Sequence, residues 1–391
     1  MAEQRGYDLV LFGATGFTGG LTAAYLARHA PGSCRWALAG RDPAKLEAVR
    51  VRLAAIEPRC AELDLLQADA TKPDTLREVA QSARVVITTV GPYVHYGEPL
   101  VAACAEAGTD YLDLCGEPEF FDRMYVRYNA KAQQSGARII HAAGFDSIPY
   151  DLGVFYTLKQ LPADARVRVS GHLRLGGTFS GGTYASALTA ASRLLPMARA
   201  ARERAKAEPR PAGRRVRAIV GKPHREAKTG YWQVPLTTID PQIVARSAAL
   251  LDDYGPDFAY SHYASVKRLP TVVGAAFGLA AVVLLAQLPP ARRALSNLRK
   301  PGQGPSKEER ERAWFKVRFV GEGGGKRVVT EVAGGDPGYG ETAKMLGESG
   351  LCLAFDELKP IAGQVTTAAA MGDALLARLV DAGMMFRVAP A

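Results

Sequence analysis

Cysteine and histidine are scarce in this sequence of 391 residues, and neither is grouped. The five cysteines include no CxxC pair, and the six histidines form no HExxH motif. These absences argue against a disulfide framework and a metal site, so we expect no bound metal and a reducing compartment. We also expect no signal peptide, because residues 1–5 lead directly into the apolar residues 7–12, which are expected to form a strand. We therefore expect a cytoplasmic protein.

Acidic residues are scarce in one segment, residues 199–228, where eleven Lys and Arg stand against three Glu. This segment carries most of the net charge of +10. Its charges are not interleaved with aromatic side chains that stack on bases, so we expect no nucleic acid partner. Two interpretations remain open: a solvated helix and loop, or attraction to an anionic surface or substrate.

Charge of either sign is absent from residues 269–291, which are almost wholly apolar and bounded by prolines. The segment is close to the length that crosses a bilayer. Three interpretations remain open: a buried helix, a helix that docks peripherally on the inner face of a membrane, and a membrane span. A span would separate residues 314–332 from the N-terminal part of the chain, which counts against it.

A glycine-rich turn, GATGFTG at residues 13–19, is the most informative motif that is present. The apolar run 7–12 precedes it, and residues 20–29, with helical spacing of apolar side chains, follow. Strand, glycine turn and helix together indicate a dinucleotide-binding unit, because glycines admit a pyrophosphate to the backbone and the helix N-terminus offers free N–H groups. The spacing is GxxGxxG rather than the commoner GxGxxG. We expect a phosphate to bind near this turn.

Strand and helix patterns alternate through the first 150 residues. After 7–12, five further strands are expected, at 35–41, 65–70, 85–90, 109–114 and 138–143. This alternation predicts an α/β fold: a Rossmann-type, doubly wound parallel sheet over residues 1–150.

Residues 151–335 follow a different pattern and predict a second, α+β domain. Apolar and polar residues alternate along 167–175 and 314–320, and a glycine turn joins the latter to 327–332. This predicts a mixed or antiparallel sheet that contains a hairpin. The domain includes the basic segment 199–228 and the apolar segment 269–291. Residues 336–391 are expected to form helices that return to the first domain.

The end of the second strand indicates which dinucleotide binds. Arg41 stands where a carboxylate would otherwise hold the adenosine ribose, and a guanidinium there accommodates a 2′-phosphate, so NADP(H) is favoured over NAD(H). Asp42 and Pro43 are explained as the start of a helix. Asp69 ends the third strand, where it either borders the adenine or simply terminates the strand.

Two further strand ends carry candidate functional residues. Gly91, Pro92 and Tyr93 follow the fourth strand, and the Tyr93 phenol is either a core side chain or a group that orients or protonates at the nicotinamide end. Asp146 and Ser147 follow the sixth strand, where the chain leaves the first domain. They contact cofactor or substrate there, or Asp146 caps the helix that begins near Pro149.

Several motifs together resemble the saccharopine dehydrogenase-like oxidoreductases, and within them the trans-acting enoyl reductase subfamily. They are GATGFTG, AGRD at 39–42, VGPY at 90–93 and GFDSIPYDLG at 144–153, with GTFSGGT at 177–183 and DPGYG at 336–340 extending the likeness. The resemblance implies an NADPH-dependent reductase of a lipid-like or polyketide-derived double bond. It places cofactor binding at Gly13, Thr15, Gly16, Phe17, Thr18, Gly19, Arg41, Gly91 and Tyr93.

The leading hypothesis is therefore reduction of a hydrophobic enoyl substrate, in which Tyr93 or Ser147 supplies the proton. One alternative is a saccharopine-type amino-acid dehydrogenase, whose polycarboxylate substrate requires several inward-pointing arginines. The second domain offers Arg174 and Arg193 for this role, with no clear cluster. Another is a non-enzymatic NADP(H)-binding protein docked on a membrane or lipid droplet. The sequence does not indicate an oligomeric state.

Overall fold

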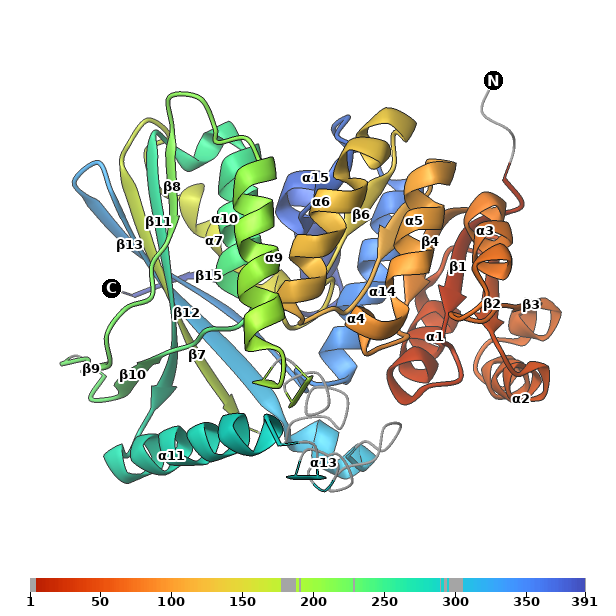
Figure 1. Ribbon diagram of the computed structural model, residues 1–391, viewed down its shortest axis with the longest axis horizontal. Helices are drawn as coiled ribbons and strands as arrows, with labels where there is room; N and C mark the ends of the chain where they lie inside the picture. Colours follow the sequence, from red (N-terminus) through yellow and green to blue (C-terminus); the bar gives the residue numbers. More distant parts are fainter. Residues whose placement is uncertain are drawn as a thin grey trace.

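Two β-sheets stand side by side with helices packed between and around them, as Figure 1 shows. The computed structural model describes residues 5–176, 188–189, 191–227, 229–288, 290–291, 294 and 305–390. The GTFSGGT motif at 177–183, most of the segment 289–304 and Lys228 lie outside the described residues.

Sheet A is parallel throughout, in the order β14-β6-β5-β4-β1-β2-β3. Its strands are β1 (Tyr7–Phe12), β2 (Trp36–Gly40), β3 (Asp64–Gln67), β4 (Ala83–Thr88), β5 (Asp110–Leu112), β6 (Arg138–Ile140) and β14 (Gly363–Val365). The six strands expected from the first 150 residues are present, in the order of a doubly wound nucleotide-binding sheet. The Rossmann prediction is confirmed, and β14 is a seventh strand that the pattern did not predict.

Helices cover both faces of sheet A, as a parallel sheet requires. The first domain contains α1 (Phe17–His29), α2 (Pro43–Ala54), α3 (Pro73–Ser82), α4 (Tyr93–Tyr96), α5 (Glu98–Ala107), α6 (Pro118–Ser135) and the 3₁₀ turn Pro58–Glu62. One face packs on α3, α5 and α6, and the other packs on α1 and a later helix, α14 (Gly340–Phe355). Asp42 caps α2 as expected, accepting a hydrogen bond from the Lys45 amide at 3.2 Å.

Sheet B is mixed, which confirms the prediction for the second domain. Its central path is β15-β13-β12-β7-β11-β10-β9, and β8 also pairs with β11. The pairs β7–β11 and β8–β11 are parallel, and the others are antiparallel. The strands are β7 (Val167–Gly176), β8 (Arg215–Ala218), β9 (His224–Arg225), β10 (Trp232–Pro235), β11 (Asp257–Val266), β12 (Trp314–Gly323), β13 (Lys326–Gly334) and β15 (Met385–Ala389).

Helices α7 (Ile148–Leu158) and α10 (Asp240–Leu250) cover the apolar face of sheet B, and α15 (Thr367–Asp381) packs on α7 and α14. Gly153 allows α7 to lie close to the sheet, since a Cβ at this position would lie 2.3 Å from the Phe319 ring of β12. Alternate residues of β12 are buried, with their polar neighbours half-buried or exposed, which explains its period-two pattern. The remaining helices are α9 (Leu194–Ala207), α11 (Leu269–Ala286), α13 (Lys307–Arg312) and the 3₁₀ turn Asp252–Tyr254.

The C-terminal part of the chain contributes to both sheets. Helix α14 packs on α1, and β14 extends sheet A beside β6. The last strand, β15, then pairs with β13 in sheet B. Residues 336–391 therefore connect the two sheets, in addition to the helical return that the sequence predicts.

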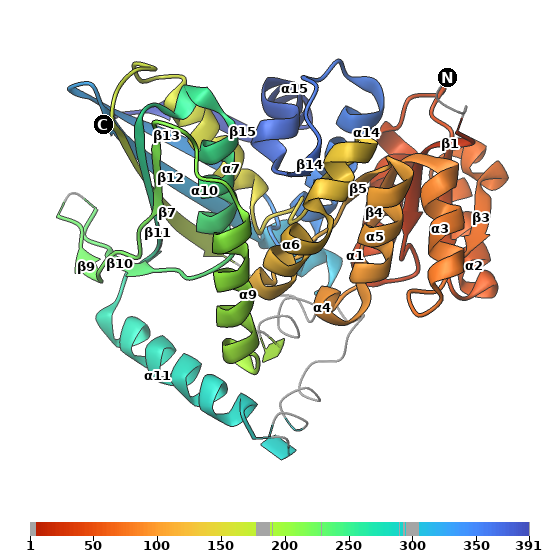
Figure 2. The ribbon, with the colours of Figure 1, turned by 45° about the horizontal axis from the view of Figure 1, so that its top comes forward.

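Helix α11 lies on the outside of the molecule and stands away from the sheets in Figure 2. Phe277 is 73% exposed and Leu284 is 70% exposed, whereas Ala286 near the end is buried. The interpretation of 269–291 as a buried helix is therefore wrong. A uniformly apolar sequence resembles a core helix, but here the helix lacks a covering layer among the described residues. Within the described ranges, no helix has the length and apolar character that crossing a bilayer requires.

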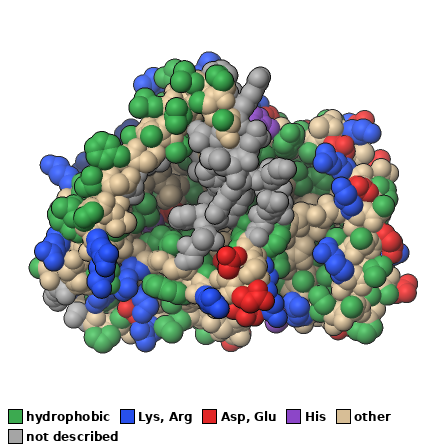
Figure 3. All heavy atoms as spheres, turned by 90° about the horizontal axis from the view of Figure 1, so that it is seen from below, with side chains coloured by type: hydrophobic (Ala, Val, Ile, Leu, Met, Phe, Trp, Pro, Cys, Tyr) green, Lys and Arg blue, Asp and Glu red, His purple; other side chains and the backbone are tan. Residues whose placement is uncertain are grey.

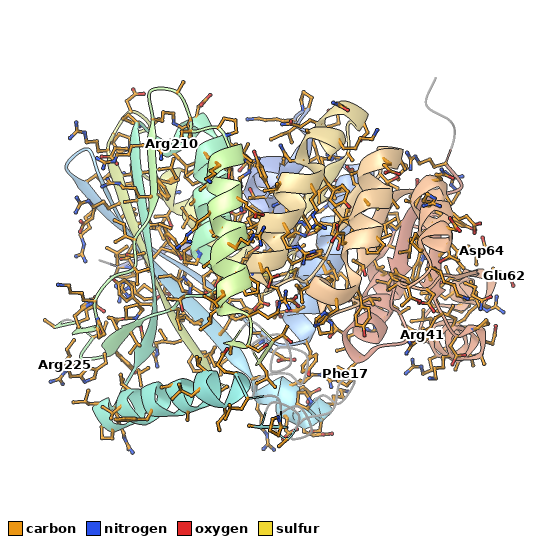
Figure 4. All side chains as sticks on the ribbon, viewed as in Figure 1. Phe17, Arg41, Glu62, Asp64, Arg210 and Arg225 are labelled. Atoms are coloured by element: carbon orange, nitrogen blue, oxygen red, sulfur yellow. The ribbon has the colours of Figure 1, made fainter. Side chains whose placement is uncertain are left out.

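The basic segment 199–228 does not form one continuous cationic surface. Figure 4 shows Arg210 and Arg225 at well-separated places on the second domain. Arg204 is buried and pairs with Asp122 at 3.1 Å, and Arg217 pairs with Asp257 at 2.5 Å. Part of the positive charge thus stabilises the fold, an explanation that the count of charges along the sequence does not reveal.

Candidate functional site

The glycine turn after β1 exposes backbone without side chains at the N-terminus of α1. Gly13 has φ +93°, and a Cβ there would lie 2.8 Å from Thr89 Oγ1 and Val90 Cγ2. A Cβ on Gly19 would lie only 2.1 Å from the Gly13 carbonyl oxygen. The helix begins after Gly16 without a side-chain cap. Its first N–H groups are therefore available to an anion, which is the fit that a dinucleotide pyrophosphate requires.

The DPGYG motif packs against this turn. The Tyr339 ring meets the Phe17 ring edge-on, with centroids 4.6 Å apart. Asp336 fixes the motif, because its carboxylate accepts hydrogen bonds from the amides of Gly338 at 3.1 Å and Gly340 at 3.0 Å. A segment more than three hundred residues away in the sequence thus supports the cofactor turn.

Arg41 follows β2 at the same edge of sheet A and is exposed. Figure 4 shows Arg41 and Phe17 on the lower side of the first domain. Among the described residues Arg41 makes no hydrogen bond or ion pair, so its guanidinium is available to a phosphate. Asp69, after β3, instead bonds its own turn: its carboxylate accepts from the Thr71 amide at 2.9 Å and the Thr71 hydroxyl at 2.8 Å.

Gly91 and Pro92 lie between β4 and α4, and Tyr93 is the first residue of α4. Glu117 holds this turn, since its carboxylate accepts hydrogen bonds from the amides of Tyr93 at 3.0 Å and Val94 at 2.8 Å. The Tyr93 hydroxyl donates to the Thr88 carbonyl at 3.2 Å and accepts from the Leu114 amide at 3.1 Å. Burial, with the nearby Asp113 carboxylate, raises the pKa of Tyr93 well above its usual value.

Asp113 is a structural centre of the site that the sequence analysis treated only as part of a strand. Its fully buried carboxylate accepts hydrogen bonds from the amides of Cys115 and Ala142, each at 2.9 Å. It also accepts from the Tyr111 hydroxyl at 2.9 Å and contacts His141 Nδ1 at 2.7 Å. Asp113 therefore ties the turn after β5 to the turn after β6. In the sequence, the one indication of this role is that a charged residue follows an apolar strand.

Ser147 holds the turn after β6. Its fully buried hydroxyl donates to the Ala142 carbonyl at 2.7 Å. Ala142 has φ +59°, an unfavourable conformation for a residue with a side chain, so this turn depends on the bonds that Asp113 and Ser147 make to it. Ser147 thus fixes the backbone immediately beside Asp146.

Asp146 lies where the two domains meet and is partly exposed. It does not cap α7, because the residue before that helix is Ser147 and no side chain caps it. Its carboxylate rests on Gly116, where a Cβ would lie 2.9 Å from Oδ2. In the described part of the chain this carboxylate makes no hydrogen bond or ion pair. Desolvation raises the pKa of Asp146 to about 6.

A second acidic group lies deeper between the domains. Asp240, at the start of α10, is buried, and desolvation raises its pKa well above the usual value, with Asp146 contributing. His262 Nε2 lies 3.9 Å from Asp240 Oδ2, and burial lowers the pKa of His262 to about 3. The His262 ring also meets the Tyr150 ring edge-on at 4.5 Å. The interdomain region therefore holds carboxyl groups and a neutral imidazole.

The two arginines considered for a polycarboxylate do not converge here. Arg193 forms a two-pronged pair with Glu119, at 2.7 and 2.8 Å. Arg174 lies over the ring of Tyr231 at 4.6 Å and that of Trp314 at 5.8 Å. Both guanidinium groups thus have other partners.

Comparison with known proteins identifies the first domain. Residues 9–140 match the family model of the saccharopine dehydrogenase NADP binding domain. A putative trans-acting enoyl reductase of Mycobacterium tuberculosis is 42% identical, over 98% of this chain and 97% of its own length. A trans-acting enoyl reductase of Mycobacterium ulcerans is 39% identical, over 98% of each chain.

Comparison with solved structures gives the same fold. Saccharopine dehydrogenase (L-Glu forming) of Saccharomyces cerevisiae superposes with a TM-score of 0.58 at 12% identity, covering 98% of this chain and all of the yeast chain. At that identity the likeness concerns the fold alone. The mycobacterial proteins, in contrast, are 39–42% identical over almost the whole chain. This chain therefore belongs to the trans-acting enoyl reductase family, within the saccharopine dehydrogenase-like proteins.

Proposed function

We propose that the protein is an NADPH-dependent reductase of a carbon–carbon double bond in a hydrophobic, lipid- or polyketide-type enoyl substrate. The observation that carries the proposal is the extent of identity to the trans-acting enoyl reductases, which includes both domains. The cofactor is NADP(H), because the first domain belongs to an NADP-binding family. The bare glycine turn and the exposed Arg41 at one sheet edge fit that cofactor.

The first 150 residues would bind the cofactor, and residues 151–335 would select the substrate. The glycine turn would hold the pyrophosphate, Arg41 the 2′-phosphate, and the strand ends after β4 and β6 the nicotinamide half. The residues proposed for cofactor contact are Gly13, Thr15, Gly16, Phe17, Thr18, Gly19, Arg41, Asp69, Gly91, Pro92, Tyr93 and Asp146. When bound, NADPH supplies the hydride.

Tyr93 and Ser147 support the site rather than serve as proton donors in this proposal. Each hydroxyl already donates to a backbone carbonyl, that of Tyr93 to Thr88 and that of Ser147 to Ala142. Releasing either proton would leave a buried carbonyl without its partner, which carries a free-energy cost of about 1–3 kcal/mol. A polar side chain without such a partner is the better candidate.

A saccharopine-type activity is disfavoured by the charge between the domains. Its polycarboxylate substrate would meet the carboxyl group of Asp146, whereas Arg174 and Arg193 have other partners. Carboxylate ligands require clustered cations, and placing them beside further carboxyl groups is unfavourable. An uncharged enoyl group does not incur this repulsion.

NADPH oxidation tests the proposed function directly. We expect turnover with medium- and long-chain 2-enoyl thioesters and none with saccharopine or with imines of amino acids. Mass spectrometry should find a product heavier by two hydrogens. Tight NADPH binding without turnover on enoyl, ketone and imine substrates would instead indicate a non-enzymatic binding protein.

For the exposed helix α11 we propose a peripheral contact with an anionic membrane surface. Apolar side chains gather along this helix on the face of the molecule seen in Figure 3, and Lys267 and Arg268 precede it. Apolar insertion combined with basic flanks is the combination that binds anionic lipid headgroups. The double variant Phe277→Asp with Leu284→Asp should lose co-sedimentation with phosphatidylglycerol vesicles. The control Val51→Asp, an exposed position on α2, should still sediment; equal binding of all three proteins would refute the contact.

A further inference from the structure

The order of strands in sheet A determines which part of a bound dinucleotide reaches which strand. The glycine turn follows the central strand β1, and Arg41 follows β2 on one side of it. If these hold the pyrophosphate and the 2′-phosphate, the nicotinamide half must extend to the other side, over the ends of β4, β5 and β6. Asp146 lies after β6, against Gly116 after β5. This step rests on the proposed function.

Most polar side chains at these strand ends are already committed to the fold. Asp113 and Glu117 accept backbone amides, and the hydroxyls of Tyr93 and Ser147 donate to carbonyls. Asp146 is the exception within the described ranges, because no hydrogen bond or ion pair engages its carboxyl group and the residue is partly exposed. A general acid gives up its proton in each turnover and recovers it from water. A side chain without a hydrogen bond to the fold is suited to this role.

The surroundings of Asp146 keep its carboxyl group protonated to higher pH than an exposed aspartate. Among the described residues, the titratable side chains that interact electrostatically with Asp146 include Cys115 after β5, Tyr150 on α7 and Asp240 on α10. None of these is a cation. From sheet B, His262 lies on the Tyr150 ring but is neutral, since burial lowers its pKa to about 3. Desolvation therefore acts unopposed and raises the pKa of Asp146 to about 6.

We propose that Asp146 is the general acid of the reductase and protonates the α-carbon of the enoyl substrate. As the hydride of NADPH forms the new bond at the β-carbon, the proton of the Asp146 carboxyl group forms the new bond at the α-carbon. The double bond becomes a single bond, NADPH becomes NADP⁺, and Asp146 is left as a carboxylate. Solvent then reprotonates it. Ser147 is a positioning residue, because its hydroxyl fixes the turn that aims Asp146.

The pH dependence of turnover distinguishes this role from a structural one. The wild-type kcat should fall about tenfold per pH unit above about pH 6, because the acid must be protonated. Asp146→Asn should lower kcat by about a hundredfold or more, change KM little, and leave a residual rate that is flat across this range. Asp146→Glu should restore part of kcat and a descending pH profile. The control Asp381→Asn, on the exposed end of α15, should behave as wild type.

Two measurements without turnover accompany the kinetics. NMR titration of the aspartate carboxyl carbons should show a resonance with a pKa of about 6 that disappears in Asp146→Asn, while buried Asp151, whose pKa burial also raises to about 6, persists. NADPH affinity should change less than about threefold, since Asp146 is not needed to hold the phosphates.

The outcomes separate this inference from the proposed function. A wild-type protein without turnover on any enoyl thioester would contradict the proposed function, whatever Asp146 does. A wild-type protein that turns over, with Asp146→Asn retaining its kcat and its pH profile, would overturn only the assignment of Asp146. A large loss of kcat in Tyr150→Phe, together with a normal kcat in Asp146→Asn and a wild-type rate that does not fall above pH 6, would transfer the acid role to the Tyr150 phenol, whose pKa burial raises well above the usual value.

Discussion

Arg41 carries the discrimination between the two dinucleotides at a single exposed position after β2. We expect Arg41→Ala to weaken NADPH binding about tenfold to a hundredfold, because a charge-assisted hydrogen bond to the 2′-phosphate is lost. NADH, which lacks that phosphate, should bind equally well to both proteins. Fluorescence titration of each dinucleotide measures this. Arg77→Ala, which removes an exposed arginine from α3, is the control, and unchanged NADPH affinity in Arg41→Ala would contradict the assignment.

The raised pKa of Asp146 also predicts how the free energy of unfolding changes with pH. Its pKa is raised to about 6 in the folded protein, so between about pH 4 and pH 6 the folded state holds a proton that the unfolded chain has lost. Stability therefore falls as pH rises through this window, and Asp146→Asn should remove that part of the fall. The variant's gain over wild type should grow to at most about 3 kcal/mol above pH 6. Urea unfolding at several pH values measures it; a gain independent of pH would contradict the raised pKa.

At the scale of the element, the turn between β1 and α1 requires glycine at some positions but not at all of them. A Cβ at Gly19 would lie 2.1 Å from the Gly13 carbonyl oxygen, whereas one at Gly20 would lie an ordinary 3.7 Å from the Ala14 oxygen. Gly19→Ala should therefore distort the turn and abolish NADPH binding. Gly20→Ala, its matched control, should bind normally and gain about 0.5–1 kcal/mol in stability from helix propensity. Equal dinucleotide affinity in the two variants would contradict this description of the turn.

Sequence patterns predicted elements well where local spacing determines the structure. Apolar runs that alternate with helical patterns were sufficient for six strands of sheet A, and alternation of apolar and polar residues was sufficient for the β12–β13 hairpin. The patterns failed where contacts with distant parts of the chain determine the structure. Strand β14 has only three residues and no pattern of its own, and exists because β6 offers a free edge. Helix α11 has a core composition but is exposed, since no pattern records which elements cover a helix.

The same distinction between local pattern and distant contact determines which residues of the candidate site could be predicted. Glycines and Arg41 indicated the cofactor because their chemistry does not depend on distant neighbours. The structural role of Asp113, and the bonds that occupy the hydroxyls of Tyr93 and Ser147, depend on contacts between successive strand ends. Such contacts form only when the sheet assembles, so local spacing cannot reveal them.

At the scale of the whole molecule, a buried ionic network joins the two domains. Arg204 on α9 pairs with Asp122 on α6, at 3.1 Å, and with Glu208 at 2.7 Å. Arg246 on α10 also pairs with Glu208 and donates to the Gln364 carbonyl of β14 at 3.0 Å. Helices of the second domain are thereby connected to a helix and a strand of the first. This network fixes the relative position of the two domains, on which the proposed site between them depends.

Removing one member should therefore cost far more than a surface ion pair would. Arg204→Ala leaves the Asp122 carboxylate, 1% exposed, without its cation, and we expect a loss of about 3–5 kcal/mol in the free energy of unfolding. Arg199→Ala, on the same helix, breaks only the exposed pair with Glu203 and should change stability little. Adding Asp122→Asn to Arg204→Ala should recover part of the loss, since no unpaired charge then remains. Urea unfolding of the four proteins measures these differences. Equal stability of Arg204→Ala and Arg199→Ala would show that the network does not hold the domains together.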